Sequence, residues 1–84
     1  MTSSAIAVHL FAAARAAVGA HQVDISGATL ADVVNQLVST YPSFGAVAPR
    51  CSFLIDGLAA HGDPALVPLA PGTRVDVLPP FAGG

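Results

Sequence analysis

One amphipathic helix most constrains what this chain of 84 residues can fold into. In the segment TLADVVNQLVSTYP, apolar side chains recur at the three- and four-residue spacing of one helix face; they are Leu30, Val33, Val34, Leu37, Val38 and Tyr41. Thr29 is a suitable N-cap, Asp32 stands where the helix dipole favours an acid, and Pro42 ends the run. A chain of this length forms one domain, so this helix must bury its apolar face against the rest of it.

The segments before the helix alternate with the two-residue period of β-strands. Residues 5–11 alternate Ile, Val and Leu with Ala, His and Phe, and residues 21–26 alternate through Val23 and Ile25. Between them, AAARAAVG favours a short helical turn that ends at Gly19. We predict strands over Ala5–Phe11 and His21–Ser26 that pair with each other.

Three more strands are predicted after an irregular segment over residues 42–50. CSFLI and LAAH flank Asp56-Gly57, a pair suited to positive φ angles, which indicates a hairpin. RVDVLP alternates again, with Val75 and Val77 directed inward. The element order indicates an α+β fold with a mixed sheet of about five strands and one main helix across its apolar face. We expect a single domain over residues 1–84.

The composition excludes several classes of function. The hydrophobic fraction is 54% against 10% charged residues, so we expect some apolar surface to be a partner's docking site. The chain has no lysine and a net charge of −2, which argues against binding to nucleic acid or an anionic membrane. The first residues lack the pattern of a signal peptide, and no apolar run approaches membrane-spanning length. The cytoplasm is the expected location.

The titratable side chains show no catalytic or metal-binding pattern. His9, His21 and His61 lie in three different elements without ligand spacing, so no metal site is expected. The aspartates occur in strand-face, cap and turn contexts that need no catalytic role; they are Asp24, Asp32, Asp56, Asp63 and Asp76. Cys51 is interpreted as a small core residue, the alternative being a thiol made reactive by Arg50.

The segment LPPFAGG at residues 78–84 carries the clearest functional signal. Pro79 and Pro80 have fixed φ and no N–H, so the last strand should end there and lead into a stiff extended tail. Gly83 and Gly84 lack Cβ and can enter a narrow site, which they would reach with an α-carboxylate at the end. That anion can attack the α-phosphate of ATP in a partner's active site and become an acyl-adenylate. We therefore interpret the tail as functional rather than frayed.

Leu78 and Phe81 are the expected anchors for a partner protein. Leu78 is out of phase with Val75 and Val77 and should lie on the opposite face of the last strand, and Phe81 lies in the tail. The alternatives are that Leu78 caps the far edge of the sheet and that Phe81 folds back on the body.

Nearly the whole chain resembles the MoaD/ThiS family of ubiquitin-like sulfur carriers, through the element order, HLFAAARAAVG and PLAPGTRVDVLPPFAGG. A terminal Gly-Gly occurs throughout that superfamily, and PP followed two residues later by GG is characteristic of its molybdopterin synthase branch. The resemblance implies a ubiquitin-like β-grasp fold. It also implies that Gly84 is adenylated and becomes a thiocarboxylate, 1-thioglycine, that donates sulfur to cyclic pyranopterin monophosphate in molybdenum cofactor biosynthesis.

The same resemblance implies the partners. An E1-like adenylating enzyme would use ATP and Mg, a sulfurtransferase would supply persulfide sulfur, and two carriers would flank a dimer of large subunits in a heterotetramer. The tail would thread into the partner's active site through Pro79, Pro80, Phe81, Ala82 and Gly83. The carrier would bind no cofactor and have no catalytic residue of its own, so it would not be an enzyme.

Three alternatives stay open. The chain is a sulfur carrier for cysteine or thiamine synthesis, a ubiquitin-like modifier of protein lysines, or a binding module with an inert tail. Because the chain has no lysine, it should form no lysine-linked chains with copies of itself. Arg15 matches a basic position after which many family members have an acidic residue, where this chain has Ala16.

Overall fold

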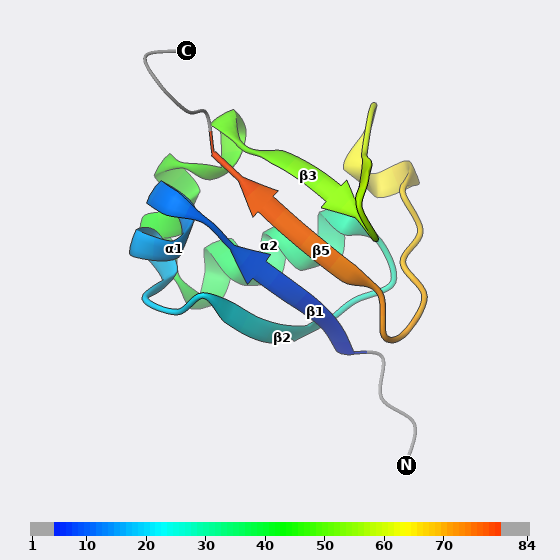
Figure 1. Cartoon of the computed structure of the whole chain (residues 1–84), viewed down its shortest axis with the longest axis horizontal. Coiled ribbons are helices and arrows are strands. Elements are labelled where there is room, and N and C mark those ends of the chain that lie inside the picture. The colour runs from blue at the N-terminus through cyan, green and yellow to red at the C-terminus, as the bar shows by residue number, and fades with distance from the viewer. Residues whose placement is uncertain (1–4, 80–84) are drawn as a thin grey trace.

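The structure is a computed structural model that describes residues 5–79. Five strands form one mixed sheet in the order β2-β1-β5-β3-β4, in which β1 and β5 are parallel and the other neighbours antiparallel. The elements along the chain are β1 (Ala5–Leu10), α1 (Ala12–Val18), β2 (Gln22–Ser26), α2 (Leu30–Thr40), the 3-10 turns η1 (Pro42–Ala46) and η2 (Ala48–Arg50), β3 (Ser52–Ile55), β4 (Leu58–Ala59), the 3-10 turn η3 (Pro64–Leu66) and β5 (Arg74–Leu78). In Figure 1, α2 lies behind the sheet and crosses it. The predicted α+β fold and the β-grasp arrangement are confirmed.

The core fills the space between α2 and one face of the sheet. Alternate residues of β1 and β5 are buried there, which confirms that Val75 and Val77 point inward. The buried side chains of these strands and of α2 are Ile6, Val8, Leu10, Val75, Val77, Leu30, Val33 and Leu37. Every second side chain of each strand thus packs against the single apolar face of the helix.

Thr29 caps the start of α2, as the sequence predicts, and Asp32, which was expected only to favour the helix dipole, completes a capping box. The side chain of Thr29 accepts a hydrogen bond from the Asp32 N–H at 3.2 Å. In return, Asp32 Oδ2 accepts from the N–H groups of Ala28 at 2.9 Å and Thr29 at 3.1 Å. A Cβ on Gly27 would lie 2.9 Å from Asp32 Cβ, so glycine leaves the room for this close approach. The carboxylate satisfies N–H groups that the first turn leaves unpaired.

These hydrogen bonds make the capping box sensitive to acid. The N–H of Ala28 and then that of Thr29 hold the pKa of Asp32 below its ordinary value of 3.8. The ionised carboxylate therefore stabilises the fold above that value, and the stabilisation is lost as the pH falls through the lower folded-state pKa.

We expect Asp32→Asn to unfold at lower denaturant than the parent chain at pH 7. The difference between the two urea midpoints should narrow as the pH falls below 3.8, because the parent carboxylate then becomes protonated. Urea titrations of both proteins at a series of pH values measure this gap. A gap that stays constant from pH 7 to pH 2 would contradict the role assigned to the charge.

The helical turn predicted in the first connection is confirmed as α1, which is capped at Gly19. Several other bounds differ from the prediction: β1 ends at Leu10 rather than Phe11, and β2 begins at Gln22 rather than His21. The segment over residues 42–50, expected to be irregular, forms η1 and η2 and fully buries Phe44. Pro42 is the first residue of η1 and Pro49 the second residue of η2, where proline has no N–H to leave unpaired.

The hairpin at Asp56-Gly57 is confirmed, but its second strand is shorter than predicted. Asp56 and Gly57 have φ angles of 48° and 87°, the left-handed values of a tight hairpin turn. The Arg74 N–H donates to Asp56 Oδ1 at 2.9 Å, which ties the turn to β5. β4 holds only two residues, and both are exposed. The LAAH segment therefore lies at an edge that is only partly paired.

Candidate functional site

The tail is rooted at the end of β5, between β1 and β3. β5 ends at Leu78, which pairs with Ser52 of β3, so the ladder stops at the proline pair as predicted. Leu78 itself is a strand residue, which corrects the predicted tail boundary of 78–84. Pro79 is buried, so the chain still packs against the body there. The remaining predicted tail residues lie outside the described part of the chain; they are Pro80, Phe81, Ala82, Gly83 and Gly84.

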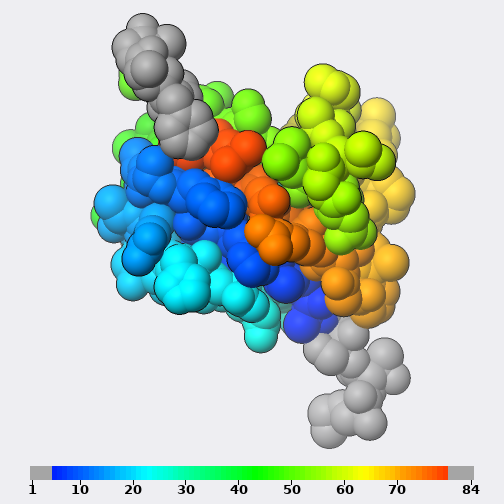
Figure 2. All heavy atoms as spheres, viewed as in Figure 1, coloured from blue at the N-terminus to red at the C-terminus, as the bar shows by residue number. Residues whose placement is uncertain are grey.

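The sheet face turned away from α2 is open, and Figure 2 shows it with β1 and β5 along its middle. Leu78 and Leu54 lie on this face and are half-buried. The predicted position of Leu78, opposite to Val75 and Val77, is confirmed. We name this surface the open face.

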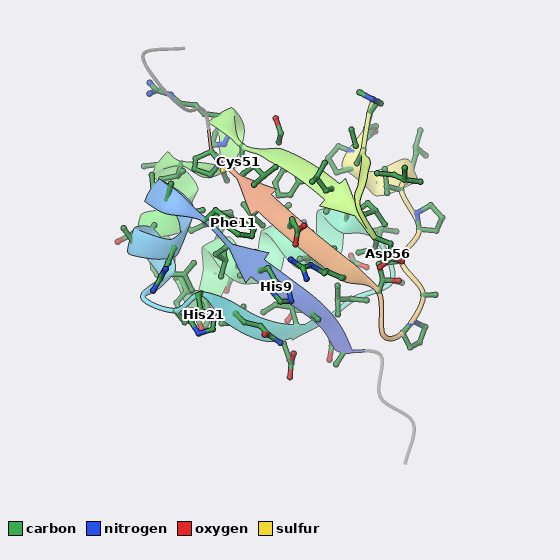
Figure 3. The ribbon with its side chains drawn as sticks, viewed as in Figure 1. His9, Phe11, His21, Cys51 and Asp56 are labelled. Atoms are coloured by element: carbon green, nitrogen blue, oxygen red, sulfur yellow. The ribbon has the colours of Figure 1, made fainter. Side chains whose placement is uncertain are left out.

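Phe11 lies on the open face beside the root of the tail, at a position that was not predicted as a partner anchor. Its N–H donates to the carbonyl of Val77 at 3.3 Å, which continues the β1–β5 register and places Phe11 next to Leu78. The side chain is 38% exposed. Figure 3 shows Phe11 near the end of β5. The sequence does contain a signal for this position: Phe11 alternates with the inward-facing Leu10, so it shares the outward face of the strand with His9.

The backbone at Ala12, the next residue, fixes the position of Phe11. Ala12 has a φ of 50°, in the left-handed region that residues other than glycine rarely adopt. This kink lets α1 begin immediately, and the carbonyl of Phe11 accepts hydrogen bonds from Ala14 and Arg15 at 3.1 and 3.3 Å. Phe11 is thus held between strand and helix.

Charged side chains occupy the middle of the open face. Arg74 Nε lies 2.7 Å from Asp76 Oδ1, and the Asp76 side chain is only 13% exposed. His9 stands between Gln22 and Asp76 in the register of the three strands. The open face therefore has an apolar end at the tail root, followed by a polar and charged middle.

Cys51 lies at the same end of the sheet, near the C-terminal end of β5 (Figure 3). Its side chain is half-buried and packs against the core, which agrees with the interpretation of Cys51 as a small core residue. The thiol donates a hydrogen bond to the Val47 carbonyl at 3.3 Å. Burial raises the pKa of the Cys51 thiol, which opposes the reactive alternative.

The other titratable residues take the structural positions predicted for them. Asp56 lies in the hairpin turn, and Asp63 caps η3 by accepting from the Ala65 N–H at 2.9 Å. His21 and His61 are exposed. Among residues 5–79, no group of three or more His, Cys, Asp or Glu side chains could hold a metal ion. Within the same range, no helix is long and apolar enough to span a membrane.

Residues 8–84 match the model of the ThiS family. No curated protein sequence matches the chain. Among solved structures, small archaeal modifier protein 1 (SAMP1) from Methanosarcina acetivorans is 25% identical, with a TM-score of 0.85 over 100% of both chains.

Two solved structures of lower identity share the fold. The putative molybdopterin converting factor subunit 1 from Pyrococcus furiosus is 21% identical, with a TM-score of 0.79 over 94% of this chain and 100% of that chain. A chain in the complex of subunits 1 and 2 of the molybdopterin-converting factor from Helicobacter pylori is 16% identical, with a TM-score of 0.71 over 95% and 99% of the two chains.

Proposed function

The chain belongs to the ThiS family, whose β-grasp fold is shared by sulfur carriers and ubiquitin-like modifiers, and we propose that it is the sulfur carrier subunit of a molybdopterin synthase. The observation that carries the proposal is the family match, which extends from β1 through Gly84. The Pro79-Pro80 pair, two residues before Gly83-Gly84, supports the molybdopterin branch. The cytoplasm is the compartment that we propose for this reaction.

The proposed chemistry takes place at the Gly84 carboxylate. In the active site of an E1-like partner, this carboxylate attacks the α-phosphorus of ATP, pyrophosphate leaves, and an acyl-adenylate forms. A persulfide sulfur of the sulfurtransferase then attacks the acyl carbon and AMP leaves. A thiol reduces the resulting acyl disulfide, which leaves the thiocarboxylate on Gly84. The partners supply ATP, Mg and the catalytic groups, and the carrier supplies the carboxylate and its placement.

The open face is the surface that we propose for partner docking. A partner that receives the tail must also contact the body where the tail begins, because the thiocarboxylate has to be delivered into a closed site away from water. Phe11 and Leu78 provide apolar area at that point. Aromatic and aliphatic side chains at the centre of an interface contribute most of its binding energy.

We expect Phe11→Ala and Leu78→Ala each to weaken binding of the large subunit by about ten- to a hundredfold, as is usual for anchors of this kind. Titration calorimetry with the isolated large subunit measures the change. The matched control is Leu66→Ala, because Leu66 is 78% exposed and lies in η3, off the open face. Equal affinities for all four proteins would place the interface elsewhere.

A second candidate function is attachment to other proteins as a modifier. The observation that favours it is the similarity to SAMP1 over the full length of both chains. A modifier would use the same adenylated carboxyl but pass it to an amine, which leaves an amide in place of a thiocarboxylate.

Intact mass spectrometry after incubation with an E1-like enzyme, ATP and a persulfide source separates the two functions. Replacement of one oxygen by one sulfur supports the carrier, and a second sample with lysine-containing acceptor proteins reports amide conjugates. If neither product forms while the enzyme activates a proven carrier, the proposal fails for that enzyme.

A further inference from the structure

A pocket of about 530 Å³ opens between α2, η2 and the β3–β4 hairpin. Its walls include Leu30 and Val34 of α2, Ala48 of η2, Phe53 of β3 and Ala60 after β4. No aspartate or arginine lines it, and its polar side chains are those of Ser52 and His61. The volume falls within the range of about 300–1,000 Å³ found for ligand pockets, so one aromatic ring fits easily.

The pocket lies close to the root of the tail. Cys51 and Ser52 line it, and Ser52 is the cross-strand partner of Leu78. Adjacent strands are separated by about 4.8 Å. Pro79, the next residue, is buried and shares the helix-facing side with Val77, which is also the side of α2 and the pocket. Phe81 follows two residues later, a span of up to about 7 Å before its ring adds to the reach.

We propose that Phe81 of the chain's own tail docks in this pocket when no partner is bound. Phe81 is the one aromatic residue beyond the described range, and Pro80 and Ala82 beside it are also uncharged. An apolar ring entering this pocket displaces water without desolvating a carboxylate or a guanidinium group. A tethered ring is present at an effective concentration of about millimolar, which favours it over a side chain from a separate molecule.

Docking would regulate access to the end of the chain. A partner that needs an extended tail must first release the ring. This inference goes beyond the proposed function, since it applies equally to a sulfur carrier and to a modifier.

The test uses the absence of tryptophan from the chain. In Phe81→Trp, the single indole reports directly on the environment of residue 81. We expect blue-shifted emission and protection from acrylamide, with docked molecules outnumbering free ones by about tenfold, the ratio expected for net burial of one aromatic ring. Emission typical of free indole would overturn the proposal, provided that the unmodified chain also lacks nuclear Overhauser contacts between the Phe81 ring and the Val34 methyl groups.

A pocket-filling variant identifies where the indole is bound. Ala60 lines the pocket and pairs with Phe53, so Ala60→Phe added to Phe81→Trp should shift the emission to that of exposed indole. The control is Ala46→Phe in the same background, since Ala46 is exposed and outside the pocket lining. Circular dichroism checks that all variants are folded. Blue-shifted emission that survives Ala60→Phe, or that appears only at high protein concentration, would overturn docking of the chain's own ring in this pocket.

Discussion

Deletion of Gly84 is expected to abolish formation of the thiocarboxylate while leaving the fold intact. The deletion moves the terminal carboxyl back by one residue, about 3.5 Å along an extended chain. Misplacement of a reacting atom by even about 1 Å can cost about a hundredfold in rate, so we expect at least that loss of sulfur loading. Intact mass measured over time with the activating enzyme, ATP and persulfide gives the rate.

Two comparisons make this test specific. Gly84→Ala keeps the carboxyl in register and adds only a Cβ, so it separates the position of the carboxyl from the need for a residue without a side chain. The thermal midpoint of the deleted chain should equal that of the parent, because Gly84 has no side chain to bury and lies six residues beyond the end of β5 at Leu78. Loading of the deleted chain at the parental rate would show that the reactive group is not the Gly84 carboxyl.

Phe44→Ala is expected to have the largest effect on stability, lowering the free energy of unfolding by about 3–5 kcal/mol. Phe44 is the largest fully buried side chain and lies in η1, directly after α2. Its removal leaves a cavity in the core where η1 packs against α1 and α2. Because the total free energy of unfolding of a small domain is only about 5–15 kcal/mol, the variant should be partly unfolded at moderate temperature.

Urea denaturation measures this loss, with Leu66→Ala as the comparison. Leu66 is 78% exposed, so its truncation should change the free energy of unfolding by no more than about 0.5 kcal/mol. A loss below about 1 kcal/mol in Phe44→Ala would mean that the core closes around the missing ring or that Phe44 contributes little to it.

The elements that the sequence predicted correctly carry a periodic pattern. The i, i+3, i+4 spacing from Leu30 to Tyr41 fixed α2, and the alternation through Val75 and Val77 fixed the inward face of β5. Thr29 was predicted correctly as the N-cap because capping chemistry is local, whereas the return hydrogen bonds to Asp32 were not predicted. The hairpin at Asp56-Gly57 followed from the φ preferences of its two turn residues.

The features that the sequence did not reveal depend on contacts between distant segments. Phe44 lies in a segment without periodicity, and only the packing of η1 against α1 and α2 makes it a core residue. Phe11 gains its position from a hydrogen bond to Val77, at the other end of the chain. The pocket near the tail root likewise needs three segments to come together. Local pattern therefore predicted the elements, and tertiary pairing created the candidate site.

The parallel pairing of β1 with β5 has a consequence for the order in which the protein folds. The strand that roots the tail occupies a central position, between the first strand and β3. Pairs so distant in sequence form late in folding, because the entropy of closing the intervening chain must be offset first. In a chain whose β5 has not yet paired, Leu78 and Phe11 are not yet side by side, so a partner that binds them as proposed above would distinguish folded from unfolded copies.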